Sequence, residues 1–164
     1  MLTWGEFAEA DPYLAQKGEA QIFQHGVGLA FLATVRSDGA PRVHPVCPVL
    51  SDSRLYVLVI PGSPKRWDLV RDGRYALQSF PQPRPDSDEF FIAGRANLVH
   101  DPREFATVFA DATHQASRDE ILFELRIDRA MHTAWEGFGT AEIHPAHTKW
   151  PRSDRGKRRG RRGG

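Results

Sequence analysis

The sequence predicts a mainly β fold with additional helices: an antiparallel barrel of six to seven strands, with the helices at its periphery. First, three apolar segments follow one another between residues 28 and 60, separated by short turns rich in Ser, Asp and Gly. Strands joined by such tight turns pair antiparallel. Second, residues 29–35 are apolar on both faces, which is typical of a strand covered on both sides. Third, β-type segments recur as far as residue 135, so about seven strands are available to close the sheet.

Two helices are predicted before the first strand. Thr3 and Glu6 have the spacing of a capping box, which indicates a short helix at the start of the chain. Asp11 followed by Pro12 begins a second helix over residues 13–25, and Gly26 ends it. That helix carries a narrow apolar stripe for docking on the barrel, made of Leu14, Gly18 and Ile22.

The boundaries of the first three strands follow from their turns. These strands are expected at 29–35, 41–50 and 55–60. Pro61, Gly62 and Pro64 then end the sheet, because proline cannot donate to a strand ladder. Ser63 is expected as the N-cap of a short helix that reaches Asp72, with a proline at its first position.

Strands and one helix alternate in the second half of the chain. Further strands are expected at 74–80, 89–99, 121–127 and 131–135. Residues 81–86 hold three prolines and are expected to form a loop. Gly94 lies inside a strand and predicts a bulge or a close backbone approach. Asp101 begins the last helix, where Glu104 has the spacing to complete a capping box.

The composition favours a single domain, at residues 1–150, inside the cell. With 164 residues, 40% of them hydrophobic, the chain is long enough for one substantial core. No stretch approaches the roughly 20 apolar residues of a membrane-spanning helix, and the first residues lack the layout of a secretory signal. The single Cys47 cannot form an internal disulfide, which fits the cytoplasm. His144 and His147 have no Cys or carboxylate at ligand spacing, so we predict no metal site.

Residues 151–164 form a basic tail that we predict to be disordered. From residue 152 it holds seven Lys/Arg and one Asp, which leaves 15 basic and 20 acidic residues in the rest of the chain. Such a tail can contact nucleic acid or an acidic surface through its cations. No nucleic-acid-binding pattern accompanies it, so the favoured interpretation is a solubilising extension without a specific partner.

The residues around the third predicted helix start indicate an anion site. Lys65 and Arg66 lie beside the free N–H groups of a helix N-terminus. Cations there oppose the helix dipole, so a bound anion that offsets them is favoured. Phosphate is the favoured anion.

Three pieces of the chain, in this order and spacing, resemble one family. They are LATVRSDGAPRVHPVCPV, LYVLVIPGSPKRWDLVRDGRYAL and EFFIAGRANLVHDP, within residues 28–102. They are similar to a strand–turn–strand with Gly and Pro, an S-x-K loop before a short helix, and a central strand with G-x-A. The chain thereby resembles the pyridoxamine 5′-phosphate oxidase-like superfamily of flavin-binding split β-barrels. The resemblance implies FMN as the cofactor, bound at the interface of a homodimer.

The resemblance also implies which residues bind the cofactor. Arg42 and Lys65 match the positions that bind the FMN phosphate, in agreement with the anion site inferred from the helix start. Ser63 and Arg66 are their neighbours. The backbone expected to line the flavin ring comprises Val43, His44, Pro45 and Val46 in the second strand, and Leu58 and Val59 in the third. His44 shares a strand face with Arg42, so it would contact cofactor or substrate, or serve as a half-buried structural histidine.

Two departures from the family pattern bear on the activity. Glu89 takes the place of a polar residue that is often Gln, and a carboxylate near a flavin would disfavour the anionic reduced ring unless it points elsewhere. The C-terminal region, IDRAMHTAWEGFGTAEIHPAHTKWPRS, lacks the Arg and His pattern with which the true oxidases bind their substrate phosphate. This departure argues against vitamin B6 oxidase activity itself.

The sequence therefore favours an FMN-dependent oxidoreductase that acts on a small-molecule substrate, which it does not identify. No residue stands out as a catalytic acid or base, and this suits hydride transfer directly to or from the flavin ring. Two alternatives stay open: a deazaflavin-dependent reductase of the same fold, and a non-enzymatic flavin- or haem-binding protein.

Overall fold

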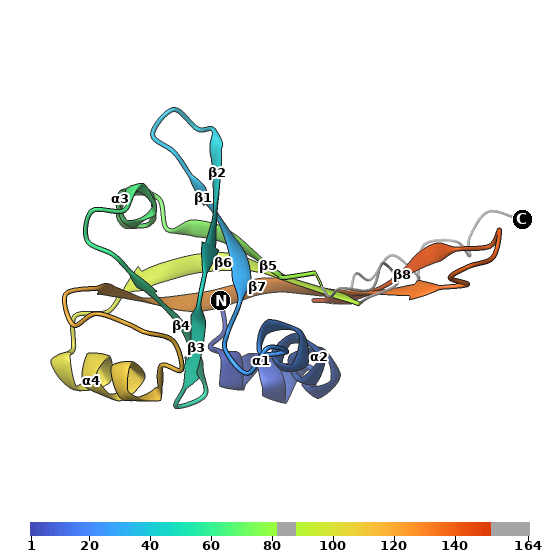
Figure 1. Ribbon diagram of the computed structural model, residues 1–164, viewed down its shortest axis with the longest axis horizontal. Helices are drawn as coiled ribbons and strands as arrows, with labels where there is room; N and C mark the ends of the chain where they lie inside the picture. Colours follow the sequence, from blue (N-terminus) through green and yellow to red (C-terminus); the bar gives the residue numbers. More distant parts are fainter. Residues whose placement is uncertain (82–87, 152–164) are drawn as a thin grey trace, which may run out of the picture.

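The computed structural model describes residues 1–81 and 88–151, and contains one curled antiparallel sheet with helices around it (Figure 1). The helices of this part of the chain are α1 (Trp4–Ala10), α2 (Pro12–Ile22), α3 (Pro64–Arg71) and α4 (Pro102–Asp111). Its strands are β1 (Ala30–Val35), β2 (Pro41–Val46), β3 (Pro48–Ser51), β4 (Arg54–Val59), β5 (Arg74–Ser79), β6 (Glu89–Leu98), β7 (Ile121–Glu136) and β8 (His144–Trp150). The mainly β fold with peripheral helices is confirmed.

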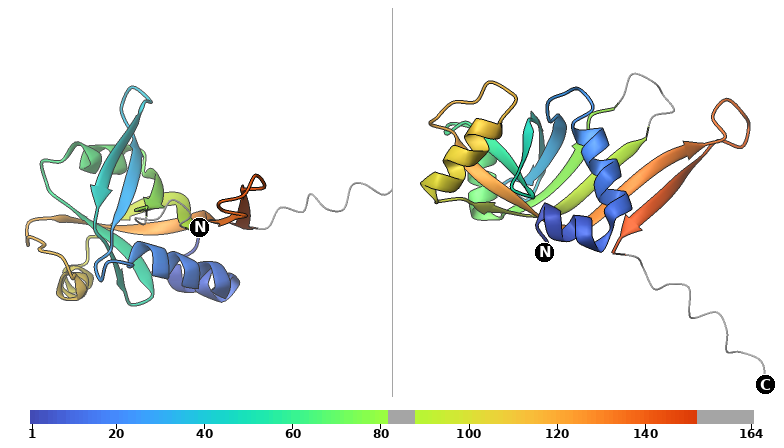
Figure 2. Two further views of the ribbon diagram at one scale, coloured as in Figure 1. Left: turned by 45° about the vertical axis from the view of Figure 1, so that its right-hand side comes forward. Right: turned by 90° about the horizontal axis from the view of Figure 1, so that it is seen from below.

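The strand order explains why the sheet curls. The strands follow one another as β2-β1-β5-β6-β7-β4-β3, and every pair is antiparallel. β2 and β3 stand at the two ends of this order, yet only Cys47 separates them in the sequence, so the chain itself draws the ends together. The result is a split β-barrel (Figure 2). β8 pairs with the C-terminal part of β7 outside this order, and together they extend away from the barrel as an arm (Figure 1).

Two apolar clusters stabilise the barrel. In the main cluster α1 and α2 pack on the sheet, and Phe7, Leu14 and Phe90 are fully buried there. Gly18 permits this approach of α2, because a Cβ at this position would lie 2.4 Å from the Phe90 ring. The smaller cluster lies under α4 and comprises Val49, Tyr56, Val108 and Leu122. α3 lies across the sheet from α1 and α2 (Figure 1) and packs on β1, where its Asp68 contacts Arg42 of β2.

The predicted helix starts are correct, although one helix ends earlier than expected and one N-cap lacks its hydrogen bond. Thr3 and Glu6 form the expected capping box, with bonds of 2.7 and 3.1 Å. Asp11 caps α2 through Leu14 N, although that helix ends at Ile22 rather than at residue 25. Ser63 is the N-cap residue of α3, but its side chain makes no capping hydrogen bond.

The expected role of Glu104 in a capping box is wrong. Asp101 does cap α4, by accepting from Arg103 N at 2.9 Å. Glu104 instead turns to the sheet, where its Oε1 accepts from Tyr56 Oη at 2.7 Å and from Arg54 Nη1 at 3.2 Å. A strand tyrosine and an arginine therefore outcompete the helix terminus for this carboxylate, which capping patterns alone do not reveal.

Gly94 has both properties expected of it. The register between β6 and β7 shifts between Ala93 and Gly94, which leaves Asp128 as the extra residue of a bulge. A Cβ on Gly94 would lie 1.9 Å from the carbonyl oxygen of Arg126, so only glycine permits this approach.

The same bulge corrects the prediction of two strands at 121–127 and 131–135. The structure has one strand, β7, over Ile121–Glu136. The polar pair at 128–129 looked like a break, but it is the bulge opposite Gly94, where both side chains are exposed without ending the ladder. The hydrophobic pattern of the sequence is therefore interrupted at residues 128–129, whereas strand β7 continues through them.

Two further differences concern strand limits. The strand expected at 41–50 is divided at Cys47 into β2 and β3, which belong to opposite ends of the sheet. β8 was not predicted, because its sequence HPAHTKW is polar and contains a proline; it is an edge strand whose pairing comes from β7. The expected loop at 81–86 and the basic tail lie outside the described residues except for Pro81 and Pro151.

In the described part of the chain, every helix is too short or too polar to cross a membrane.

Candidate anion-binding site

The predicted phosphate residues come from two elements that meet beside β1. Arg42 and His44 lie on β2, which pairs with β1, and Lys65 lies in the first turn of α3, which packs on β1. The three groups are close enough to influence one another. Burial, followed by the positive charges of Lys65 and Arg42, lowers the pKa of His44 below its ordinary value. The structure therefore brings together the two residues that the sequence places 23 positions apart.

Arg42 is oriented by a buried carboxylate, Asp68 of α3. Arg42 Nε donates to Asp68 Oδ2 at 2.8 Å, and Thr34 Oγ1 donates to the same oxygen at 2.9 Å. Although burial alone would raise it, hydrogen bonds from Arg42 and Thr34 lower the pKa of Asp68. Within residues 1–81 and 88–151, the terminal nitrogens of Arg42 make no hydrogen bond, so they are open to an anion.

Lys65 has no carboxylate partner among the described residues. Its Nζ donates only to Ser63 Oγ, at 3.2 Å. Burial lowers the pKa of Lys65, an effect that nearby Glu120 opposes. Beside it, the buried Nε2 of His44 has no hydrogen-bond partner in the described part of the chain. Burying a cation, or a ring nitrogen without a hydrogen-bond partner, costs free energy unless a ligand or a water molecule supplies the missing partner. A binding partner is therefore expected at this place.

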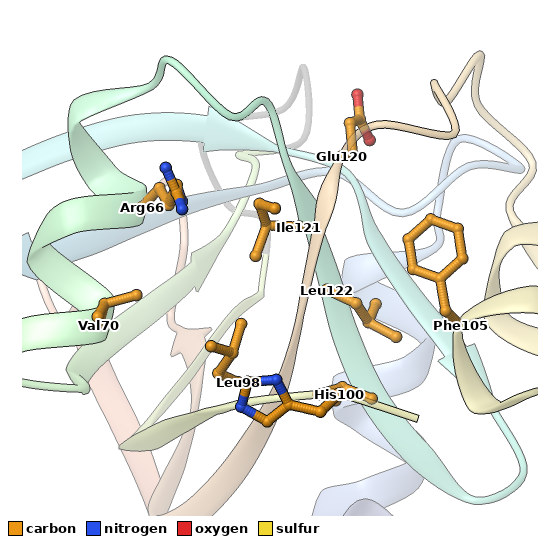
Figure 3. Close-up of a pocket in the computed structure, with 9 residues that line it drawn as sticks. Arg66, Val70, Leu98, His100, Phe105, Glu120, Ile121 and Leu122 are labelled. Atoms are coloured by element: carbon orange, nitrogen blue, oxygen red, sulfur yellow. The ribbon is translucent and has the colours of Figure 1, made fainter. Parts of the chain in front are cut away.

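Arg66 points to a different place from Lys65, as expected for adjacent helix positions. Its guanidinium stacks on the exposed Trp67 ring at 4.1 Å, and its Nη1 donates to Pro61 O at 3.3 Å. Arg66 lines a cavity of about 200 Å³ between α3, α4, the end of β6 and the start of β7 (Figure 3). Glu120 lines the same cavity, and one oxygen of its carboxylate is buried without a partner in the described chain.

The residues expected to line a flavin ring lie on β2 and β4 and differ in exposure. On β2, Val43 and Pro45 are exposed while Val46 is buried. On β4, Leu58 is half-buried and Val59 is buried, and they pair with Leu122 and Ile121 of β7.

Within one chain, Glu89 lies away from the predicted phosphate residue Arg42. Arg42 is level with Thr34, Tyr75 and Gly94 across the sheet. Glu89 is exposed at the other end of β6, five residues from Gly94, which is about 16 Å along a strand. Its carboxylate therefore does not face the Arg42 guanidinium of the same chain.

Three further residues of the site were not predicted. Asp68 follows Lys65 by three positions on α3, and this helical spacing places both near one face. Thr34 pairs with Arg42 in a hairpin whose turn the sequence predicts, so its position could also have been found. Glu120 comes from a distant segment, and no local pattern indicates it.

The comparison with protein families decides the identity of the fold. A family model described as pyridoxamine 5′-phosphate oxidase matches residues 17–134, well over half of the chain. The chain belongs to this family. No curated protein matches the sequence.

Several solved structures share the fold of this chain, at low sequence identity. PhzG from Burkholderia lata 383, in complex with tetrahydrophenazine-1-carboxylic acid, is 12% identical, with 93% of this chain and 89% of that chain covered and a TM-score of 0.63. A candidate pyridoxamine 5′-phosphate oxidase from Listeria innocua is 18% identical, with 70% and 94% covered and a TM-score of 0.57. Identities this low show the fold alone.

A haem-binding protein from Mycobacterium smegmatis has the same fold. It is 19% identical, with 79% of this chain covered and a TM-score of 0.58. The match covers 56% of that protein, so this oxidase-family chain spans just over half of its length.

Proposed function

We propose that this protein binds FMN and acts as an FMN-dependent oxidoreductase on a small-molecule substrate, as a homodimer with the cofactor at the subunit interface. The observation that carries the proposal is the meeting of Arg42 and Lys65, from two separate elements, beside a buried nitrogen of His44 that has no hydrogen-bond partner within residues 1–81 and 88–151. Membership of the pyridoxamine 5′-phosphate oxidase family supports a flavin as the ligand.

The charges of the site suit a phosphate group. Lys65 has no carboxylate within ion-pairing distance among the described residues, so its charge is available. Arg42 offers its terminal nitrogens, which can form two parallel hydrogen bonds to one phosphate. Since the Ser63 side chain does not cap α3, an anion can also contact the first turn of that helix.

In this proposal each part of the chain has one task. Arg42 and Lys65 bind the phosphate, and the backbone of residues 43–46 and 58–59 lines the ring. FMN, when bound, supplies the hydride chemistry. Glu89, about 16 Å along the sheet from Arg42 in its own chain, takes no part in binding the phosphate. We assign no catalytic acid or base.

An apolar outer face supports the dimer. On the outer side of β1, β5 and β6, and at Phe80 just after β5, most side chains are apolar and only half-buried: Phe31, Ala33, Val35, Ala76, Phe80, Phe91 and Ala93, with the polar Gln78 between Phe31 and Phe91. The adjacent Val43 is 60% exposed. A largely apolar surface of this kind marks an interaction site, and a second copy would remove it from water. The single Cys47 supports a cytoplasmic location.

Spectroscopic titration of the purified protein tests the proposal. We expect absorbance maxima of oxidised flavin and saturable binding of FMN. Replacing both phosphate residues, Arg42→Ala with Lys65→Ala, should weaken FMN binding more than about tenfold, because each lost charged hydrogen bond contributes at least about 1.5 kcal/mol. The matched control is Arg36→Ala with Arg103→Ala, which removes the same charge from exposed positions. Unchanged FMN affinity in the first variant would place the phosphate elsewhere, and a protein that binds deazaflavin but not FMN would overturn the choice of cofactor.

One observation favours haem as the second candidate. The buried Nε2 of His44, which has no hydrogen-bond partner in the described chain, is the kind of nitrogen that ligates haem iron. A Soret band that disappears in His44→Ala would establish this alternative and contradict the flavin proposal.

A further inference from the structure

One buried carboxylate beside the site joins three elements. Asp68 lies on α3 with 4% of its side chain exposed. Its Oδ2 accepts from Thr34 Oγ1 of β1 and Arg42 Nε of β2, and Arg71 Nη2 lies 3.5 Å from its Oδ1. Thr34 and Arg42 are register partners, so this carboxylate fixes α3 against the hairpin that carries Arg42.

We infer that Asp68 is a positioning residue for the cofactor phosphate: by binding Nε of Arg42, it directs the two terminal nitrogens of the same guanidinium toward the anion. The inference rests on the proposed function. A guanidinium can offer a phosphate either the edge that includes Nε or the edge of its two terminal nitrogens. Because Asp68 occupies Nε, Arg42 binds the phosphate end-on, through Nη1 and Nη2.

A simple neutralising role is the alternative, and the structure argues against it. Arg71, one helical turn from Asp68, already supplies a cation to this carboxylate and also donates to the carbonyl oxygen of Val35. Asp68 nevertheless makes its shorter ion pair with Arg42, whose side chain is 27% exposed and so extends toward the surface. A buried carboxylate is costly to retain beside a phosphate site, where its charge repels the ligand, unless it organises a donor.

The two roles predict opposite results for Asp68→Asn. If Asp68 only neutralises Arg42, its removal leaves more positive charge, and FMN binds more tightly. If Asp68 positions Arg42, its removal frees the guanidinium, and the phosphate binds less tightly. Titration of the full-length protein with FMN and with riboflavin, which lacks the phosphate, isolates this effect as the ratio of riboflavin Kd to FMN Kd.

We expect this ratio to fall about tenfold in Asp68→Asn, as for loss of one charged hydrogen bond, while the riboflavin Kd changes less than about twofold. Asp72→Asn is the matched control. It removes an acid just beyond α3 whose carboxylate lies 2.6 Å from Arg74 Nε, and it should leave the ratio unchanged. In an Arg42→Ala background Asp68→Asn should no longer change the ratio, because Asp68 acts through Arg42.

An unchanged or increased ratio in Asp68→Asn overturns the inference, as does an equal fall in the Arg42→Ala background. If Asp68→Asn does not fold, Thr34→Val, which removes a second donor from the same carboxylate, takes its place. Its ratio should fall about twofold, and no fall overturns the inference. A wild-type protein that binds riboflavin as tightly as FMN overturns the proposed function and the inference together.

Discussion

Arg42 and Lys65 differ in how their charges are balanced. Arg42 is paired with Asp68 at 2.8 Å, so its role depends on the direction of its free nitrogens more than on net charge. Lys65 has only the Ser63 hydroxyl as its hydrogen-bond partner in the described chain, so it supplies a charge that no ion pair there neutralises. Arg42 therefore orients a phosphate bound at this site, and Lys65 supplies the positive charge that attracts it.

His44 gives the ligand-free protein a pH dependence. Burial, then the charges of Lys65 and Arg42, lower its pKa, and only Asp68 opposes them. The unfolded chain therefore binds more protons at His44 than the folded chain does once the pH falls below about 6.5. The contribution of neutral His44 to stability is present above that pH and is lost as the pH falls toward the lower pKa of the folded state.

Thermal unfolding between about pH 5 and pH 7 checks this. His44→Asn should lose less thermal stability on acidification than the wild type, because the residue that must stay neutral is gone. An identical pH dependence in the two proteins would assign the acid loss to other groups.

At the scale of helices and strands, the helix starts were predicted from neighbouring residues, whereas the limits of several strands depend on pairing with residues distant in the sequence. The helix starts at Thr3, Asp11 and Asp101 depend on neighbours within a few residues, and all three are correct. β8 depends on pairing with β7, and its own sequence is polar. The single strand β7 was missed because its bulge is set by Gly94, which lies far away in sequence.

The close approach at that bulge predicts one mutation. Gly94→Ala should destabilise the protein by more than about 2 kcal/mol, because the new methyl group would lie 1.9 Å from Arg126 O and the backbone must move. Gly62→Ala is the control, since a Cβ there meets nothing within 4 Å. Denaturant unfolding of both variants compares them, and equal stability would contradict the tight pairing of β6 with β7.

At the scale of the whole molecule, the fold and half of the site could be predicted from the sequence. Arg42 and Lys65 stood out because strand, turn and S-x-K loop resemble the family, and the structure places them together. Asp68 and Glu120 gain their importance only when α3 and the start of β7 reach the same barrel end. The dimer stays a prediction, supported by the half-buried apolar face of β1, β5 and β6.

A crystal structure of the protein with FMN tests the central claim most directly. The account predicts FMN between two copies of the chain, with phosphate oxygens about 2.7–2.9 Å from the terminal nitrogens of Arg42 and from Lys65 Nζ. Arg42 Nε should remain on Asp68. A phosphate bound away from both cations, or a flavin enclosed by one copy alone, would contradict it.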